Sequence, residues 1–116
     1  MKRSLSKDQR LKKSEDFRRV FGSPLKQGCQ GAKLVALSNS LDKLRFGVSL
    51  SKKFGNAVER NRAKRQVREI FRLHSDRLKP GYDLVFLVFP GDFDYWDRER
   101  QFLQLVARAG IERRDS

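Results

Sequence analysis

The sequence predicts a single α+β domain built around a strand–helix–strand unit with parallel strands. Three observations support this prediction. Residues 44–51 alternate between apolar and polar side chains, residues 57–74 gather apolar side chains on one side of a helix, and residues 82–89 are almost continuously apolar. A strand, a helix and a second strand in this order are typical of a parallel pair, and a chain of 116 residues can bury one modest core.

The N-terminal part of the chain is expected to contain a basic arm and then a short helix. Residues 1–13 carry six cations and one acid, which predicts a mobile arm attracted to phosphate. Ser14 can cap a helix that ends near Phe21, because acidic residues suit its first turn and Gly22 suits its end. Phe17 and Phe21 share one face of this helix, where such side chains usually pack in a core.

Strands are expected next, on both sides of a turn. Residues 22–31 contain proline and glycine without periodicity and predict a loop. A strand at about 33–38, a turn at 39–43 and a second strand at 44–51 follow. In the second strand, the side that includes Ser49 is small or polar, so one face can pack in the core while the other meets a polar ligand.

The helix predicted at 57–74 has one apolar and one basic side. Asn56 and Glu59 can form a capping box at its start. On a helical wheel, the apolar side contains Ala63, Val67, Ile70, Phe71 and His74. The opposite side contains Asn61, Arg65, Arg68 and Arg72. Cations near the start of a helix oppose its dipole, and few acids are interleaved with them, so we interpret this side as a polyphosphate-binding surface rather than a solvated one.

A last helix is expected at about 97–109, after an acidic and aromatic loop, and a polar tail at 112–116. Its predicted core positions are Leu103, Val106 and Ala107. Four carboxylates near the loop could hold the metal of a nuclease, although acids in a first helical turn also stabilise the helix without any catalytic purpose. These carboxylates belong to Asp92, Asp94, Asp97 and Glu99.

The composition restricts the possible functions. The net charge of +13 and a pI near 10.6 indicate nucleic acid or an anionic membrane as the partner. No apolar run approaches the ~20 residues that span a bilayer, and no apolar signal segment follows Met1, so we expect a cytoplasmic protein. Cys29 and His74 are the only residues of their types, which excludes an intramolecular disulfide and the common nucleophile–base pairs. The single cysteine also argues against a structural zinc site.

The arginines of the basic helix suit phosphate, because the planar guanidinium presents donors that match two oxygens. The basic arm, the polar strand face and this helix could border one groove. Exposed rings of Phe17 and Phe21 would there stack on unpaired bases. Single-stranded RNA is the expected ligand.

The residues around the start of the basic helix strongly resemble the protein subunit of bacterial ribonuclease P. The signature is Arg60-Asn61-Arg62 followed by Lys64-Arg65, on a helix entered through Gly55-Asn56-Ala57-Val58. Residues 10–17 are similar to the opening of that family, and residues 46–51 to its strand before the basic helix. The similarity covers about residues 10–89.

The resemblance implies an α/β sandwich similar to domain 2 of ribosomal protein S5. This fold has a mixed sheet of about four strands, three helices and a left-handed βαβ crossover, against the general handedness rule. It also implies a non-catalytic subunit that joins a catalytic RNA and assists removal of the 5′ leader from precursor tRNA. Mg²⁺ is expected mainly on the RNA, and neither a membrane nor a small-molecule substrate is expected.

The resemblance also assigns candidate RNA contacts. On the basic helix they are Arg60, Asn61, Arg62, Lys64, Arg65 and Arg68, with Lys52 and Lys53 at its entry. The leader cleft is expected to contain Phe17, Phe21, Ser49 and Ser51. Relatives often carry an aromatic residue on the first strand where this chain has Val35-Ala36, so one stacking platform is expected to be missing or supplied elsewhere.

Two other functions are compatible with the residues alone. A ribosomal or general RNA-binding protein could use the same basic side without taking part in catalysis. A protein-only nuclease could use Asp92, Asp94 and Asp97. Cleavage of precursor tRNA by protein alone, by RNA alone or only by both together would distinguish the three.

Overall fold

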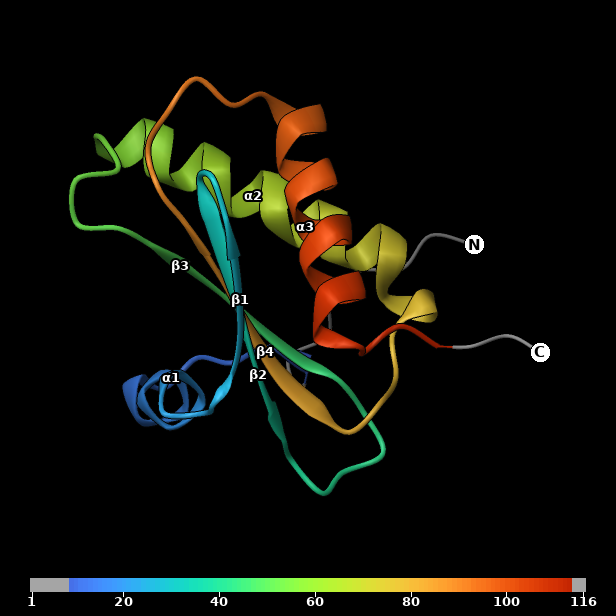
Figure 1. Cartoon of the computed structure of the whole chain (residues 1–116). Helices are drawn as coiled ribbons and strands as arrows, with labels where there is room; N and C mark the ends of the chain where they lie inside the picture. Colours follow the sequence, from blue (N-terminus) through green and yellow to red (C-terminus); the bar gives the residue numbers. More distant parts are fainter. Residues whose placement is uncertain (1–8, 114–116) are drawn as a thin grey trace.

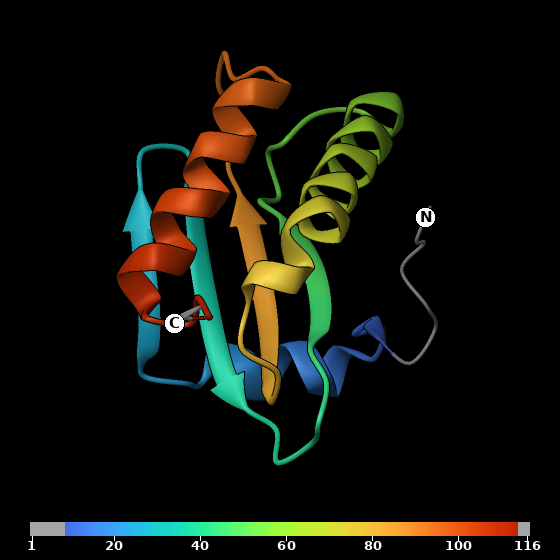
Figure 2. The ribbon, with the colours of Figure 1, turned by 90° about the vertical axis from the view of Figure 1, so that its right-hand side faces the viewer.

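A mixed sheet separates one short helix from two long ones in residues 9–113, the part of the chain that this computed structural model describes (Figure 1). In chain order the elements are α1 (Ser14–Phe21), β1 (Leu25–Cys29), β2 (Ala32–Ser38), β3 (Arg45–Leu50), α2 (Ala57–His74), the 3₁₀ turn η2 (Ser75–Arg77), β4 (Tyr82–Val88) and α3 (Tyr95–Ala109). The strand order is β1-β2-β4-β3. Figure 2 shows α2 and α3 together on one face of the sheet and α1 behind it. The predicted fold class is confirmed.

The connection between β3 and β4 is a left-handed crossover. The two strands pair in parallel, with Phe46 opposite Leu84. In Figure 2 both strands run upward, α2 lies on the viewer's side of the sheet, and β4 lies to the left of β3. A right-handed crossover would place β4 on the other side. The predicted handedness is therefore confirmed.

Residues 25–29 form a strand and not the predicted loop. β1 pairs antiparallel with β2, with Gln27 opposite Leu34, and the hairpin turns at Gly31, whose φ is 89°. The prediction was wrong because β1 is an edge strand in which glutamine and glycine take the places of large apolar residues. Its pairing with β2 stabilises it, and no periodic signal marks it in the sequence.

Stacked phenylalanine rings form the core between the sheet and the two long helices. The rings of Phe46 and Phe71 stack with centroids 4.2 Å apart, and Phe102 meets the edge of Phe46 at 6.2 Å. The predicted apolar positions of α2 are buried, as expected: Ala63, Val67, Ile70 and Phe71. His74 lies where α2 meets α3, with Nε2 2.8 Å from a carboxylate oxygen of Glu99.

The buried side of α3 differs from the prediction. The helix begins at Tyr95, two residues before the predicted start, and Ala107 is exposed while Leu103 is only half-buried. Its fully covered positions are Arg98, Gln101, Phe102, Leu105 and Val106. The prediction was wrong because α3 packs over β1 and β2 as well as against α2, which rotates its buried stripe toward residues that are not all apolar.

A smaller apolar cluster lies between α1 and the opposite face of the sheet. It contains Leu11, Val20, Val35 and Val85, with Phe17, Phe21 and Leu37 packed against it. Of the basic arm predicted at 1–13, residues 1–8 lie outside the described residues, but Leu11 is only 5% exposed and its backbone N–H donates to the carbonyl of Phe46 at 2.9 Å. The N-cap of α1 is Lys13 and not Ser14, and no side chain caps it.

A buried carboxylate connects α1 with the sheet. Asp83 is 0% exposed and accepts hydrogen bonds from Arg45 at 2.7 and 2.8 Å, from Arg19 at 2.8 Å and from Asn39 at 2.9 Å. Burial alone would raise the pKa of Asp83, but these hydrogen bonds outweigh it and hold the pKa below its usual value. The carboxylate is therefore ionised in the folded protein at neutral pH.

Replacing Asp83 with alanine should lower the free energy of unfolding at pH 7 by about 3 kcal/mol, because it leaves Arg45 and Arg19 without their buried partner. The lowered pKa means that the carboxylate stabilises the fold above the unfolded pKa of about 4 and loses this effect as the pH falls through the folded value. Urea unfolding of the wild-type and variant chains at pH 7 and pH 3 measures the loss of stability and its dependence on pH. Asp42→Ala is the exposed control, and a loss that is equal at both pH values would contradict the prediction.

Candidate nucleic-acid interface

The basic helix α2 starts in a complete capping box. The side chain of Asn56 accepts from the backbone N–H of Glu59 at 2.9 Å, and the side chain of Glu59 accepts from the backbone N–H of Asn56 at 3.0 Å. This cap fixes the helix start directly before the run of cations. Lys52 and Lys53 are exposed in the turn that leads into it.

The side chains of α2 that were predicted to contact RNA point in three directions. Asn61 and Arg65 are exposed on the side away from the sheet. Lys64 and Arg68 are half-buried and line a groove toward α1, whereas Arg62 lines a pocket toward α3. The helix therefore offers a basic surface with a hollow on each flank.

Arg60 differs from the other cations of the helix. Its Nη1 donates to the backbone carbonyl of Ser51 at 3.1 Å, so it also fastens α2 to the end of β3. The hydroxyl of Ser51 is itself buried, without a hydrogen-bond partner among the described residues.

The groove between α1, β3 and α2, called the α1 groove below, has a volume of about 340 Å³. Its lining residues are Arg10, Leu11, Lys12, Phe17, Phe46, Gly47, Val48, Lys64 and Arg68. Four of these are cations and none is acidic. Burial lowers the pKa of Arg68, and the nearby charge of Arg10 lowers it further. An anion between these like charges would relieve their repulsion.

Phe17 lies directly on the floor of the α1 groove. A Cβ atom added to Gly47 would lie 2.6 Å from Cζ of Phe17, which is closer than real atoms approach. The absence of a side chain at Gly47 therefore allows the ring to lie against the sheet. The ring of Phe17 thus borders a groove in which all the charged lining residues are cations.

The other residues predicted for the leader cleft do not line the α1 groove. Phe21 packs against the apolar cluster under α1, and Ser49 is half-buried beside Leu87 on the same face of the sheet. Val35 is fully buried within that cluster, whereas Ala36 belongs to the core on the opposite face. Only Val35 of this pair occupies the face on which a stacking residue was expected.

Sequence reasoning predicted that the basic arm and the polar strand face border a groove, but it did not name Arg10, Lys12 and Gly47 as site residues. Arg10 and Lys12 reach it because the chain before α1 pairs with β3, where Arg10 forms a parallel bridge with Phe46. The basic character of this segment was a signal for phosphate, but its pairing partner leaves no pattern in the sequence.

The acidic loop supplies helix caps. The carboxylate of Asp94 accepts from the backbone N–H of Asp97 at 2.8 Å. The carboxylate of Asp97 accepts in turn from the backbone N–H of Asp94 at 2.9 Å. The backbone hydrogen bond from Asp94 lowers the pKa of Asp97. Glu99 contacts His74 across the helix interface. Among residues 9–113 no group of three potential metal ligands lies together.

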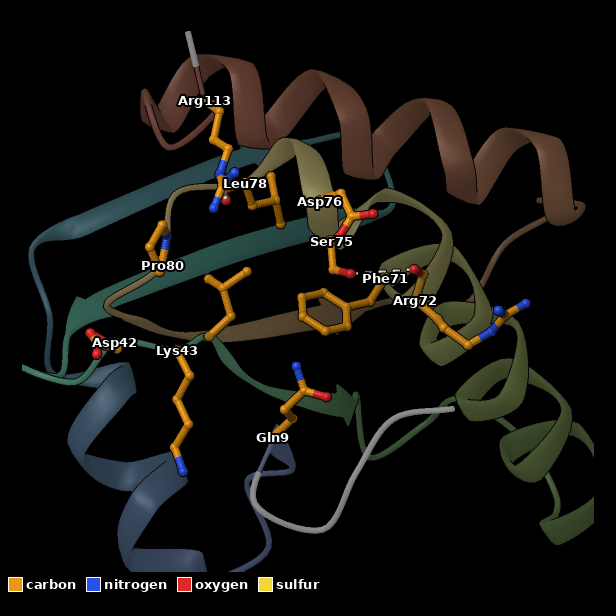
Figure 3. A pocket seen from close by; sticks show the side chains of 11 residues that line it. Gln9, Asp42, Lys43, Phe71, Arg72, Ser75, Asp76, Leu78, Pro80 and Arg113 are labelled. Carbon is orange, nitrogen blue, oxygen red and sulfur yellow. Dashed lines mark hydrogen bonds between the residues drawn. The ribbon is translucent and has the colours of Figure 1, made fainter. Parts of the chain in front are cut away.

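A second hollow, of about 420 Å³, lies at the far end of α2 (Figure 3). Its apolar lining residues are Leu44, Phe71, Leu78 and Pro80, and its charged ones are Asp42, Lys43, Arg72, Asp76 and Arg113. Of the basic side predicted for α2 only Arg72 lines it, and this arginine donates to the carboxylate of Glu69. The mixed charges of this hollow make it a poorer match to a polyanion than the α1 groove.

No helix in the described part of the chain combines the length and the apolar character that a membrane span requires.

Comparisons with known proteins point to one family. The profile of the family Ribonuclease P matches residues 5–110. The ribonuclease P protein component of Natranaerobius thermophilus is 41% identical over 103 residues, which cover 87% of this chain and 90% of that protein. That of Clostridioides difficile is 38% identical over 104 residues, covering 87% and 91%.

Solved structures agree. The RNase P protein from Thermotoga maritima superimposes with a TM-score of 0.75 at 30% identity, over 85% of this chain and 96% of that one. The Staphylococcus aureus RNase P protein gives a TM-score of 0.82 at 27% identity, and the match covers 90% of this chain and 98% of that protein.

Gly47→Ala should destabilise the fold by about 1–3 kcal/mol, because the added methyl group must displace the ring of Phe17. Gly28→Ala on β1 is the matched control, since the nearest atom to its added Cβ is 3.9 Å away. Thermal unfolding of both variants measures the difference. Combining Gly47→Ala with Phe17→Ala should recover part of the loss, and strictly additive losses would contradict the assigned clash.

Proposed function

The chain belongs to the ribonuclease P protein family, and on this premise we propose that it is the RNA-binding subunit that helps a catalytic RNA remove the 5′ leader from precursor tRNA. The observation that best supports this function is the α1 groove. Four cations, no acid and the ring of Phe17 line a groove that opens beside the basic helix α2. Cations with an interleaved aromatic ring suit single-stranded nucleic acid, whose phosphates and bases both need partners.

Two surfaces of the protein bind different parts of the RNA. The exposed side of α2 contacts the catalytic RNA and adjacent substrate through Asn61 and Arg65, with Lys52 and Lys53 at the helix entry. Arginine and lysine there neutralise phosphates and release counterions, which makes the affinity dependent on salt. The α1 groove takes the leader, with Lys64 and Arg68 on its phosphates and Phe17 against a base.

Precursor and product differ in what they offer to the groove. Only the precursor carries a leader that can fill it, so contacts made there strengthen precursor binding without strengthening binding of mature tRNA. A substrate held by its leader is also positioned for hydrolysis, and a released product no longer competes for that surface. The protein thereby contributes affinity and selectivity while the RNA performs the reaction.

We assign hydrolysis to the RNA, where bound Mg²⁺ would supply activation of water and stabilisation of the leaving oxygen. The cations of the protein assist by lowering the phosphate repulsion between two RNA molecules. Less Mg²⁺ is then needed to bring them together. Processing of precursor tRNA assigns the protein to the cytoplasm.

Cleavage of precursor tRNA at low Mg²⁺ should occur only when the chain and the catalytic RNA are both present, because each supplies what the other lacks. The assay compares protein alone, RNA alone and the mixture. Absence of stimulation in the mixture would favour a general RNA-binding protein, and metal-dependent cleavage by the protein alone would favour a nuclease.

Phe17→Leu should weaken binding of precursor tRNA by about tenfold and leave mature tRNA almost unaffected, because a base stacked on an aromatic ring contributes roughly 1–3 kcal/mol. Phe21→Leu is the matched control, since Phe21 packs in the same cluster but does not line the α1 groove. Filter binding of both tRNAs measures the ratio. Equal losses for precursor and mature tRNA would mean that the substitution damages only the core.

A further inference from the structure

We propose that a pocket between the N-terminal half of α2 and the start of α3 binds an unpaired guanine of an RNA partner, an inference that rests on the proposed function. This α2–α3 pocket has a volume of about 340 Å³ and lies outside the α1 groove. Phe54, Arg62, Gln66, Phe93, Tyr95 and Arg98 line it. Figure 2 shows that both helices begin at the same end of the sheet, and the N-terminal half of α2 lines the pocket together with the start of α3.

The first argument is the buried cation Arg98. Its side chain is 3% exposed, and its guanidinium donates to the carbonyls of Gly31 at 2.9 Å and Phe89 at 2.8 Å, and to the side chain of Gln101 at 3.1 Å. A guanidinium has five N–H groups, so these bonds do not exhaust its donors. Among residues 9–113 no carboxylate lies at ion-pair distance from it. A buried charge without such a partner favours an electron-rich ligand in the pocket beside it.

The second argument is the aromatic lining. The guanidinium carbon of Arg98 lies 4.7 Å from the centre of the Phe93 ring and 5.9 Å from that of Phe54. Tyr95 adds a third ring to the lining. A free phosphate gains little from aromatic rings, whereas a flat base gains stacking energy from them. The pocket therefore suits a base better than a phosphate.

Guanine matches the polar groups of the pocket. Its O6 and N7 are both acceptors and suit arginine donors, whereas adenine presents an amino donor beside N7. Gln66 is half-buried at the pocket and can accept or donate, and the exposed Arg62 can reach the phosphate attached to the base. The two acids at the pocket, Glu59 and Asp94, are already engaged in the capping boxes of α2 and α3.

The position of the pocket favours the catalytic RNA as the source of this base. The α1 groove lies on the flank of α2 that carries Lys64 and Arg68, whereas the α2–α3 pocket lies on the flank that carries Arg62 and Gln66. A leader that fills the groove is therefore on the other side of the helix. An RNA lying across the exposed cations of α2 can insert a base into the pocket.

The chain contains its own reporter for this pocket. Trp96 is its single tryptophan, is 64% exposed, and has its ring centroid 5.1 Å from that of Tyr95. A base that contacts Tyr95 changes the surroundings of the indole. Tryptophan fluorescence therefore reports occupancy without a label.

The test titrates the full chain with short uridine oligonucleotides that carry a central guanine, adenine or abasic site. We expect the guanine oligonucleotide to quench Trp96 and to bind about tenfold more tightly than the abasic one, as expected for one specific base contact. Adenine should fall between them. Equal affinity and equal fluorescence for all three would overturn the proposal.

Gln66→Glu should abolish the preference for guanine, because the new carboxylate neutralises Arg98 and repels O6 and N7. Gln104→Glu, on the exposed side of α3, changes the net charge equally and should keep the preference. Tyr95→Leu gives a second variant that lacks the ring, and thermal unfolding verifies that each variant folds. An unchanged preference in both pocket variants would contradict the assigned site.

Titration with the catalytic RNA alone and with precursor tRNA alone distinguishes the two sources of the base. If Gln66→Glu lowers the affinity for the catalytic RNA, the base belongs to that RNA. If the variant lowers the affinity for precursor tRNA instead, the base belongs to the precursor. Loss for neither RNA overturns the proposal, while cleavage stimulated by the wild-type chain would still support the proposed function. Selective quenching by the guanine oligonucleotide without stimulated cleavage would refute the proposed function but would support the guanine-binding pocket.

Discussion

The packing of α2 against the sheet is the interaction on which the rest of the molecule depends, because it holds a self-repelling run of cations in one place. Like charges four residues apart destabilise a helix by about 0.2–0.5 kcal/mol per pair. Burial of one phenylalanine contributes about 1.5–3 kcal/mol. The stacked rings of Phe46 and Phe71, together with the other buried side chains of α2, therefore outweigh the repulsion. The charge that remains on the outer side is available to a polyanion.

The two faces of the sheet are covered unequally, and this asymmetry creates the α1 groove. Two long helices cover one face, while α1 covers only part of the other. The chain before α1 adds to the edge of β3 through Leu11, which brings Arg10 opposite Arg68. Asp83 holds the far end of α1 against the sheet through Arg19. The open part of this face is thus bordered by fixed cations.

Local patterns were sufficient to predict the elements that carry their own periodicity and caps. The bounds of α2 and its capping box follow from Asn56, Glu59 and the apolar stripe, and β4 follows from its apolar run. β1 was missed because an edge strand is stabilised by its neighbour and not by its own residues. Arg98 was missed because a buried arginine contradicts the usual preference of this residue for the surface, and the carbonyls that bind it belong to distant segments.

The hydrogen bonds of Arg98 have a consequence for synthesis of the chain. They join the turn between β1 and β2, the end of β4 and the start of α3, so one side chain near the C-terminal end completes contacts among segments made much earlier. A nascent chain on the ribosome that has not yet reached Arg98 lacks the hydrogen bonds that secure the turn of the hairpin to the end of β4. Maturation of the fold must therefore wait until translation has passed α3, and premature termination shortly before it would yield a charged, incompletely closed product.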